Sequence, residues 1–274
     1  MTIPTVTLND GVTMPQIGFG VFQVPGAETT AAVSSALEAG YRSIDTAAAY
    51  RNETGVGQAL AQSGLARDDL FVTTKLWNTD QGRDNARPAL EASLERLGLD
   101  RVDLYLIHWP APGRGLFAET WEAFEELRAS GLTRSIGVSN FLPEHLDAII
   151  ALGGPVPAVN QIEVHPELQQ RSVQDAGALH GIVTEAWSPL AQAGVLGDPV
   201  VAEIAAAHGR TPAQVVLRWH LEQGRVVIPK SVTPSRIAEN LAITDFTLTS
   251  DEVTRIDGLE AGRRTGPDPA TFNG

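Results

Sequence analysis

Seven glycines divide this chain into repeated units in which a helix is followed by a strand. Each follows a stretch with the apolar spacing of a helix and precedes a short β-branched or aliphatic run: Gly40, Gly64, Gly98, Gly131, Gly153, Gly181 and Gly224. Glycine readily takes the left-handed backbone conformation that closes many helices, so each one indicates a junction between a helix and the next strand. The regularity predicts an α/β fold in which strands and helices alternate.

The runs that follow these glycines, with one more before the first helix, have the composition of buried strands. They are "QIGFG", "YRSID", "DLFVTTKLW", "RVDLYLIHW", "TRSIGVSN", "AVNQIEV", "IVTEAWS" and "RVVIPKS". They are mostly apolar over their length, as strands that are covered on both faces should be. Eight strands in one unbroken series within 274 residues favour a closed (β/α)₈ TIM barrel over an open doubly wound sheet. We therefore expect residues 1–274 to form one barrel domain.

Four segments fall outside the eightfold pattern. Asp10-Gly11 lies between alternating residues near the start and predicts an N-terminal β-hairpin. Residues 199–209 predict an additional helix between the seventh and eighth strands, and "TSDEVTRIDGL" predicts a second one near the end. The final stretch, residues 260–274, is typical of a loop.

The charge balance and the residue types exclude several classes of function. A formal net charge of −13 and a pI near 4.8 argue against nucleic acid or an anionic membrane as a partner. There is no cysteine, and the six histidines show no metal-binding spacing, so we expect no metal site. We find no signal segment and no run of membrane-spanning length, and we expect a cytoplasmic protein.

Polar and aromatic residues collect where the predicted strands end. In a (β/α)₈ barrel all strand carboxyl ends open onto one face, which carries the chemistry. Taken singly, Asp45 is typical of a helix cap, and Lys75 and His108 are typical of residues at a rim or in a core. Burying several such groups at one mouth is costly unless they pair, which favours a functional site. The residues at these ends are Asp45, Lys75, His108, Ser139, Asn140, Gln161, Trp187, Ser188, Lys230 and Ser231.

Three of these side chains, with a nearby phenol, make chemical sense as a proton donor. Tyr50 follows Asp45 after a stretch rich in alanine, which lets the ring fold back toward the pocket. A free phenol has a pKa of about 10, and we expect the ammonium of Lys75 to lower it by about two. Asp45 would keep Lys75 charged and aimed, while His108 would donate a hydrogen bond to a bound oxygen. Such a group donates a proton to a carbonyl oxygen as negative charge develops there.

A carbonyl group that is protonated on oxygen must also be attacked at carbon, and the chain has no nucleophile for that step. The nearest match to a G-x-S-x-G motif is "GVSNF", in which Phe141 replaces the second glycine. A hydride from a cofactor is the natural alternative. A Rossmann fingerprint is absent, since "GFGVFQ" and "GVGQAL" both lack the third glycine, so a dinucleotide would bind on another plan.

Six motifs carry a resemblance to a known family. They are "GYRSIDTAAAYRNE" (40–53), "TTKLW" (73–77), "VDLYLIHWP" (102–110), "SIGVSNF" (135–141), "NQIEVHP" (160–166) and "IPKSVTPSRIAEN" (228–240). Together they resemble the aldo-keto reductase superfamily, and in particular bacterial members of the 2,5-diketo-D-gluconate reductase type. The resemblance implies an NADPH-dependent carbonyl reductase with Tyr50 as general acid. Asp45, Tyr50, Lys75 and His108 match the family's catalytic tetrad.

The same resemblance implies a set of cofactor contacts. Ser139, Asn140 and Gln161 match residues that hold the nicotinamide carboxamide. Trp187 stands where the family places an aromatic ring, usually tyrosine, under the nicotinamide. The segment after the eighth strand matches the clamp for the adenosine 2′-phosphate, to which Lys230 and Arg236 would contribute positive charge. The full set of implied cofactor contacts is Ser139, Asn140, Gln161, Trp187, Ser188, Leu190, Lys230, Ser231, Arg236, Glu239 and Asn240.

Similarity to the family also predicts an aromatic substrate pocket. Phe22, Trp77, Trp109 and Trp187 would surround Tyr50 and His108, whereas Trp121 and Trp219, at helical spacing, are expected in the core. The short tail suggests small aldehydes, dicarbonyls and keto-sugars as substrates, and we expect a monomer. Two alternatives remain open: a nucleotide-sensing regulatory protein, and a sugar-isomerising barrel without redox chemistry. The second leaves Lys230 and Arg236 unexplained.

Overall fold

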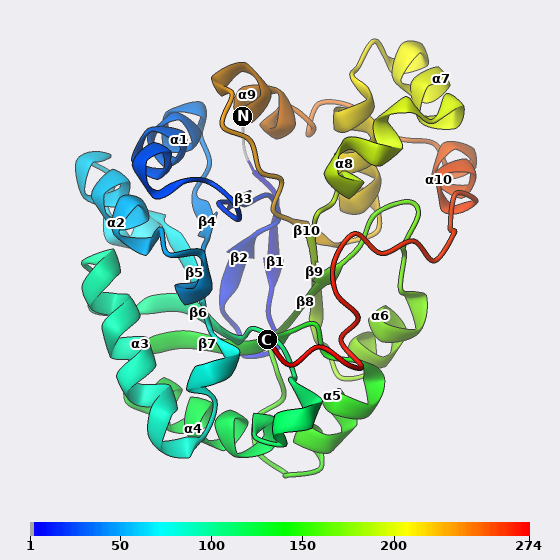
Figure 1. The fold of residues 1–274 in the computed structure, drawn as a ribbon. Coiled ribbons are helices and arrows are strands. Elements are labelled where there is room, and N and C mark those ends of the chain that lie inside the picture. The colour runs from blue at the N-terminus through cyan, green and yellow to red at the C-terminus, as the bar shows by residue number, and fades with distance from the viewer. Residues whose placement is uncertain (1–2) are drawn as a thin grey trace.

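The computed structural model describes residues 3–274 and shows a ring of helices around a cylindrical sheet (Figure 1). Neighbouring strands of the sheet run parallel, and their spatial order follows the chain without interruption. The strands are β3 (Phe19–Gly20), β4 (Ser43–Asp45), β5 (Phe71–Leu76), β6 (Val102–Ile107), β7 (Thr133–Ser139), β8 (Val159–Glu163), β9 (Val183–Trp187) and β10 (Val226–Val227).

The first and last strands meet and close the cylinder. Ile17 forms a parallel bridge with Val227, and the amide of Gly18 donates to the carbonyl of Val227 at 2.8 Å. The amide of Gly20 donates to the carbonyl of Pro229 at 3.2 Å. The predicted closed (β/α)₈ barrel is therefore confirmed, and the open doubly wound sheet is wrong.

Helices follow the strands and cover the outside of the barrel (Figure 1). The seven glycines predicted to end helices all have φ between 66° and 115°, the left-handed region that glycine adopts without strain. The two additional helices are also found, at Pro199–His208 after β9 and at Ser250–Asp257 near the end. The helices are α1 (Gly26–Ala39), α2 (Glu53–Gln62), α3 (Arg83–Leu97), α4 (Phe117–Ala129), α5 (Pro143–Ile150), α6 (Arg171–Ala178), α7 (Pro199–His208), α8 (Pro212–Glu222), α9 (Pro234–Leu241) and α10 (Ser250–Asp257).

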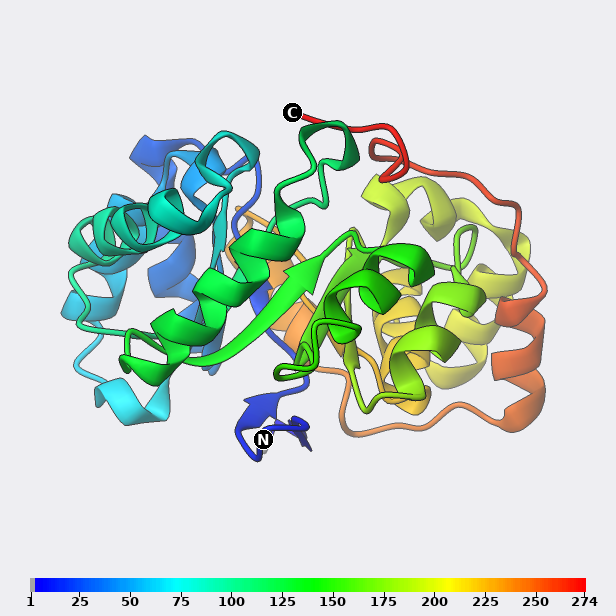
Figure 2. The same ribbon diagram turned by 90° about the horizontal axis from the view of Figure 1, so that it is seen from below.

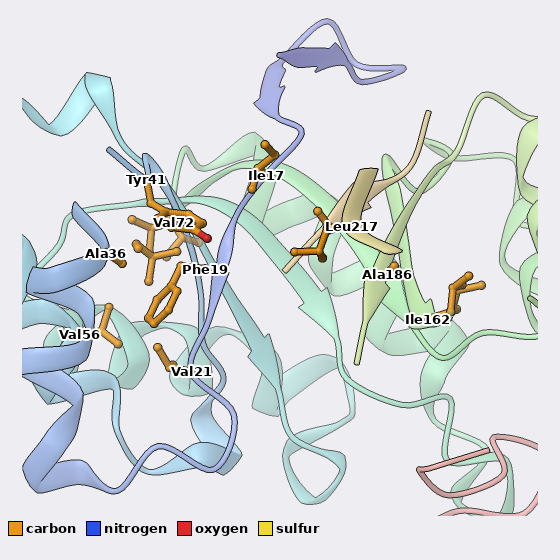
Figure 3. Close-up of a cluster of buried hydrophobic side chains, with 14 of the residues drawn as sticks. Ile17, Phe19, Val21, Ala36, Tyr41, Val56, Val72, Ile162, Ala186 and Leu217 are labelled. Carbon is orange, nitrogen blue, oxygen red and sulfur yellow. The ribbon is translucent and has the colours of Figure 1, made fainter. Parts of the chain in front are cut away.

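The larger apolar core lies between the sheet and the helices. Figure 3 shows part of it, with Phe19 and Val72 from the strands packed beside Val56 from α2. Trp121 and Trp219 are completely buried in this layer, as expected from their helical spacing. Because the outer face of the sheet packs against the helices, polar groups are found on the inner face and at the strand ends.

A second, smaller core closes one end of the barrel. The antiparallel strands β1 (Thr5–Thr7) and β2 (Thr13–Pro15) form the predicted hairpin. Leu8 and Met14 of this hairpin pack with Phe71, Leu104 and Val226, near the amino ends of their strands. Figure 2 shows the hairpin at one end of the barrel and the C-terminal segment at the other. Chemistry is therefore confined to the end that the hairpin leaves open.

None of the helices within residues 3–274 combines the length and the apolar character needed to cross a membrane.

Candidate active site

Lys75 is fully buried near the carboxyl end of β5. Its Nζ donates to Oδ1 of Asp45 at 2.6 Å and to the carbonyl of Thr46 at 2.9 Å. A third contact, at 3.4 Å, reaches the hydroxyl of Tyr50. An ammonium has three hydrogens to donate, so these contacts account for all of them and fix the charge in place.

Tyr50 reaches Lys75 because its loop folds back over the mouth. The residue ends a short 3₁₀ helix, Ala48–Tyr50, that closely follows β4. Buried Asn52 anchors this loop, since its Nδ2 donates to the carbonyls of Val21 at 2.9 Å and Val24 at 3.2 Å. Thr46 completes the anchor by donating to Oδ1 of Asn52 at 3.0 Å. Asn52 is not among the predicted site residues, because its place in the sequence is that of any loop asparagine.

Burial dominates the acid–base behaviour of this group. Burial raises the pKa of Tyr50 above its usual 10.0, and the opposing effect of Lys75 does not reverse the shift. The expected lowering of this pKa is therefore wrong in sign. Burial also disfavours the charge of Lys75, but Asp45 and Tyr50 outweigh it and raise the pKa of the ammonium above 10.5. At neutral pH the site thus holds a protonated phenol beside a protonated lysine.

His108, which follows β6, is held next to Tyr50. The two ring centroids are 5.6 Å apart and the rings meet edge to face. Burial, and then the charge of Lys75, hold the pKa of His108 well below its usual 6.5. The imidazole is therefore neutral at pH 7 and carries one N–H that can act as a hydrogen-bond donor.

Aromatic side chains surround the tyrosine and histidine. Phe22, about half exposed, lies 5.1 Å from the Tyr50 ring, and Trp77 lies 5.2 Å from the ring of His108. Phe272, from the tail, packs on Trp109 at 4.6 Å between ring centroids. Three of the four expected wall residues are therefore brought together, with Phe272 as an addition. Among residues 3–274, no ring pair joins Trp187 to this group.

Trp187 belongs instead to a polar network across β7 and β9. Its indole N–H donates to Oδ1 of Asn140 at 2.9 Å. The Nδ2 of Asn140 donates to the carbonyl of His108 and to Oγ of Ser139, both at 3.0 Å. Ser139 in turn donates to the carbonyl of Gln161 at 2.8 Å. Both amide hydrogens of Asn140 are thus used in hydrogen bonds within the protein. Toward a ligand, Asn140 can only accept a hydrogen bond, through Oδ1.

A buried glutamate outside the predicted site residues lies beside Gln161. The Nε2 of Gln161 donates to Oδ2 of Asp45 and to Oε2 of Glu185, both at 2.8 Å. Glu185 is completely buried within β9. Burial, together with repulsion from Asp45, raises its pKa from 4.5 to about 8. The only sequence signal was an acidic residue in the middle of the strand run "IVTEAWS".

The C-terminal tail crosses the mouth of the barrel (Figure 2) and is tied to the end of β8. Both the backbone N–H and the hydroxyl of Thr265 donate to Oε1 of buried Glu163 at 2.6 Å. Gly266 donates to the other carboxylate oxygen and lies directly against Trp187. At the far end, Oδ1 of Asn273 accepts from the amide of Gly113 at 2.7 Å. The tail therefore bridges the Trp187 side of the mouth and the side lined by Trp109.

The segment after β10 is exposed and basic. Lys230 and Arg236 form no ion pair within the part of the chain that the structure describes. The hydroxyl of Ser231 accepts from the amide of Thr233 at 3.1 Å, just before α9. These exposed cations attract an anion locally, whereas the rest of the chain, with a formal net charge of −13, repels one.

The remaining predicted contacts flank these groups. Ser188, with φ of 46°, and half-buried Leu190 lead into the irregular loop after β9. The carboxylate of Glu239 accepts from Thr211 at 2.8 Å and so ties α9 to the start of α8, while Asn240 is buried. No group of three or more His, Asp or Glu side chains that could hold a metal ion occurs within residues 3–274.

Known proteins similar to this chain show the family to which it belongs. The model of the aldo/keto reductase family matches residues 16–261. This chain belongs to the aldo/keto reductase family. Its similarity to individual members extends over almost its full length. An aldo-keto reductase of Mycolicibacterium smegmatis is 57% identical over 270 residues, which is 98% of each chain. Methylglyoxal reductase DkgA of Escherichia coli strain K12 is 53% identical over 277 residues, which is 100% of each chain.

Solved structures of other aldo-keto reductases share the fold in detail. A mutant of Gox0644, solved in complex with NADPH, is 48% identical and superimposes with a TM-score of 0.95 over 99% of both chains. An aldo/keto reductase from Brucella melitensis is 53% identical, with a TM-score of 0.93 over 95% of this chain and 99% of that one. The barrel of this aldo-keto reductase is therefore the fold of its relatives.

Proposed function

We propose that this protein is an NADPH-dependent reductase that converts the aldehyde and ketone groups of small substrates to alcohols. The substrates would be dicarbonyls and keto-sugars such as 2,5-diketo-D-gluconate. The observation that carries the proposal is the position of Lys75, 2.6 Å from Asp45 and 3.4 Å from the hydroxyl of Tyr50, at the open end of the barrel. Membership of the aldo/keto reductase family and the NADPH-bound relative support the choice of cofactor.

The residues present fit a phosphorylated nicotinamide dinucleotide. Among residues 3–274, no hydrogen bond engages Oε1 of Gln161, because both contacts of this amide use its nitrogen. This oxygen and Oδ1 of Asn140 are acceptors suited to the amide hydrogens of a nicotinamide carboxamide. Lys230 and Arg236 would hold the 2′-phosphate, and Trp187 would stack on the nicotinamide ring. When bound, the cofactor supplies the hydride.

Tyr50 would donate the proton that completes the reduction. Its raised pKa keeps the hydroxyl protonated at neutral pH. An alcohol is a far weaker acid than a phenol, so transfer from Tyr50 to a developing alkoxide is downhill despite this shift. The phenolate that remains would lie beside Lys75, whose charge Asp45 maintains.

Neutral His108 and the aromatic walls would orient the substrate. Because the imidazole carries one N–H, it can donate to the same carbonyl oxygen that Tyr50 protonates. Phe22, Trp77 and Trp109 surround this point, and Phe272 of the tail packs against the last two. A pocket closed in this way by the tail suits a small carbonyl compound better than a bulky one.

The cellular setting is proposed on the composition. The acidic charge disfavours nucleic acid and anionic membranes as partners, so the proposal is a cytoplasmic monomer acting on a small molecule. Residues 1–274 would act as one domain, since the barrel closes only when its first and last strands meet.

The test is the oxidation of NADPH, followed at about 340 nm, with methylglyoxal or 2,5-diketo-D-gluconate as substrate. Tyr50→Phe removes only the proton donor, and we expect kcat to fall by about 10² to 10⁴ while NADP⁺ binding, measured by calorimetry, is retained. Turnover by Tyr50→Phe at the wild-type rate would disprove the assignment of the acid. Wild-type protein that binds NADPH without turnover would favour the regulatory alternative. A wild-type protein that does not bind NADPH would favour the alternative of a sugar-isomerising barrel without redox chemistry.

A further inference from the structure

Glu185 is a buried carboxyl group that the proposed reaction does not use. It lies on β9 directly opposite Gln161 of β8, with the two Cα atoms paired in the parallel ladder. Its Oε2 accepts from Nε2 of Gln161 at 2.8 Å, and its Oε1 has no hydrogen-bond partner in the described part of the chain. A buried polar group with such limited pairing is costly to keep, which calls for an explanation of what it does.

The consequence of this contact is seen in the amide of Gln161. Its two hydrogens are divided between Asp45 and Glu185, each at 2.8 Å from Nε2. The opposite orientation of the amide would turn Oε1 toward the carboxylate of Asp45, which has no hydrogen to donate, and would give up the N–H contact to Glu185 as well. The pair of acids therefore fixes which end of the amide faces inward, and it directs Oε1 away from them.

We propose that Glu185 is a positioning residue for the cofactor: with Asp45 it locks the amide of Gln161 so that Oε1 accepts a hydrogen bond from the nicotinamide carboxamide N–H. The inference rests on the proposed function. Asp45 alone engages one of the two amide hydrogens, and it also pairs with Lys75. Glu185 engages the other hydrogen and completes the constraint.

In this role Glu185 acts as a hydrogen-bond acceptor rather than as a charge. Its pKa of about 8 leaves it mostly protonated at pH 7, since burial and the nearby carboxylate of Asp45 both oppose ionisation. Lys75 and the hydroxyl of Tyr50 are the other titratable groups whose charges interact with it. An amide that keeps one acceptor oxygen should therefore replace the carboxyl group, whereas an apolar side chain of similar length should not.

The experiment measures binding by calorimetry at pH 7 with two ligands. One is NADP⁺, and the other is its analogue in which an acetyl group replaces the carboxamide, so that the carbonyl oxygen remains but the N–H is lost. Glu185→Met should bind NADP⁺ about five- to tenfold more weakly, the equivalent of one hydrogen bond, and bind the analogue as wild type does. Glu185→Gln should bind both ligands with wild-type affinity. Gln161→Leu should lose the preference for NADP⁺, and adding Glu185→Met to it should cause no further loss.

Several results would overturn the inference. Wild-type affinity of Glu185→Met for NADP⁺, or equal weakening for both ligands, would show that Glu185 does not act through the carboxamide. Weakening by Glu185→Gln as large as that by Glu185→Met would show that charge is what matters. Thermal unfolding of each variant verifies folding, and Glu185→Leu replaces Glu185→Met should the latter fail to fold. A wild-type protein that binds neither ligand would refute the proposed function itself.

Discussion

The indole N–H of Trp187 donates to Oδ1 of Asn140 at 2.9 Å, joining the ends of β9 and β7. An indole N–H can only donate, so it fixes the orientation of the Asn140 amide, whose nitrogen then faces the carbonyl of His108. A tyrosine in this position offers a hydroxyl at a different place on the ring. The tryptophan thus couples the expected stacking surface to the residues expected to hold the carboxamide.

Trp187→Phe keeps an aromatic face and removes this donor. We expect NADP⁺ to bind about three- to tenfold more weakly, because the Asn140 amide loses a partner that orients it. Calorimetry measures the affinity directly. Trp77→Phe, a matched change on the substrate side, should leave NADP⁺ affinity unaltered, and an equal loss in both variants would contradict the argument.

Arg236→Ala tests the basic segment after β10. Removing one of two exposed cations should weaken NADPH binding by about tenfold and leave NADH binding nearly unchanged, since only NADPH has the 2′-phosphate. Arg255→Ala, which removes an arginine of α10 that pairs with Glu203, is the control. Equal losses for the two cofactors would eliminate the proposed clamp.

Gly266→Ala tests the contact between the tail and Trp187. A Cβ at this position would overlap Cη2 of Trp187, so the tail or the indole ring must move. We expect a loss of about 1–3 kcal/mol in the free energy of unfolding, together with weaker NADP⁺ binding. Gly197→Ala makes the same chemical change where a Cβ would meet nothing within 4 Å. Urea unfolding of both variants should separate them, and similar values would refute the packing argument.

The buried Glu185 should make stability fall as pH rises. The folded protein keeps its proton up to a pKa of about 8, whereas the unfolded chain releases it near 4.5. Between these values the unfolded state binds fewer protons, so the folded state loses stability as pH increases. Glu185→Gln has no such proton, and from pH 5 to pH 8 it should gain on the order of 3 kcal/mol relative to wild type. Urea unfolding at pH 5, 6.5 and 8 measures this difference. Parallel stability curves would contradict the shifted pKa.

The fold could be predicted from local signals. Glycines at helix ends, apolar strand runs and a hairpin turn each depend on a few neighbouring residues, and all are found where the sequence indicates them. The meeting of Asp45, Lys75 and Gln161 was also predictable, because the carboxyl ends of barrel strands share one face.

Other features depend on distances that a sequence does not contain. Glu185 lies two residues before the end of β9, so a pattern of polar residues at strand ends does not include it. Phe272 reaches Trp109 through a tail without regular structure. The shift in the pKa of Tyr50 results from opposing effects of burial and of Lys75. The pKa rises because the effect of burial is the larger one.

The bridge between Ile17 and Val227 has a consequence for synthesis. A ribosome releases the first strand of the cylinder long before it has made the last, so β3 must wait with one edge unpaired while nearly the whole chain emerges. Exposed edges of this kind invite pairing with other chains. Translation that stops before residue 227 would therefore yield an open sheet prone to aggregation, and chaperone demand should be highest for nascent chains just short of that length.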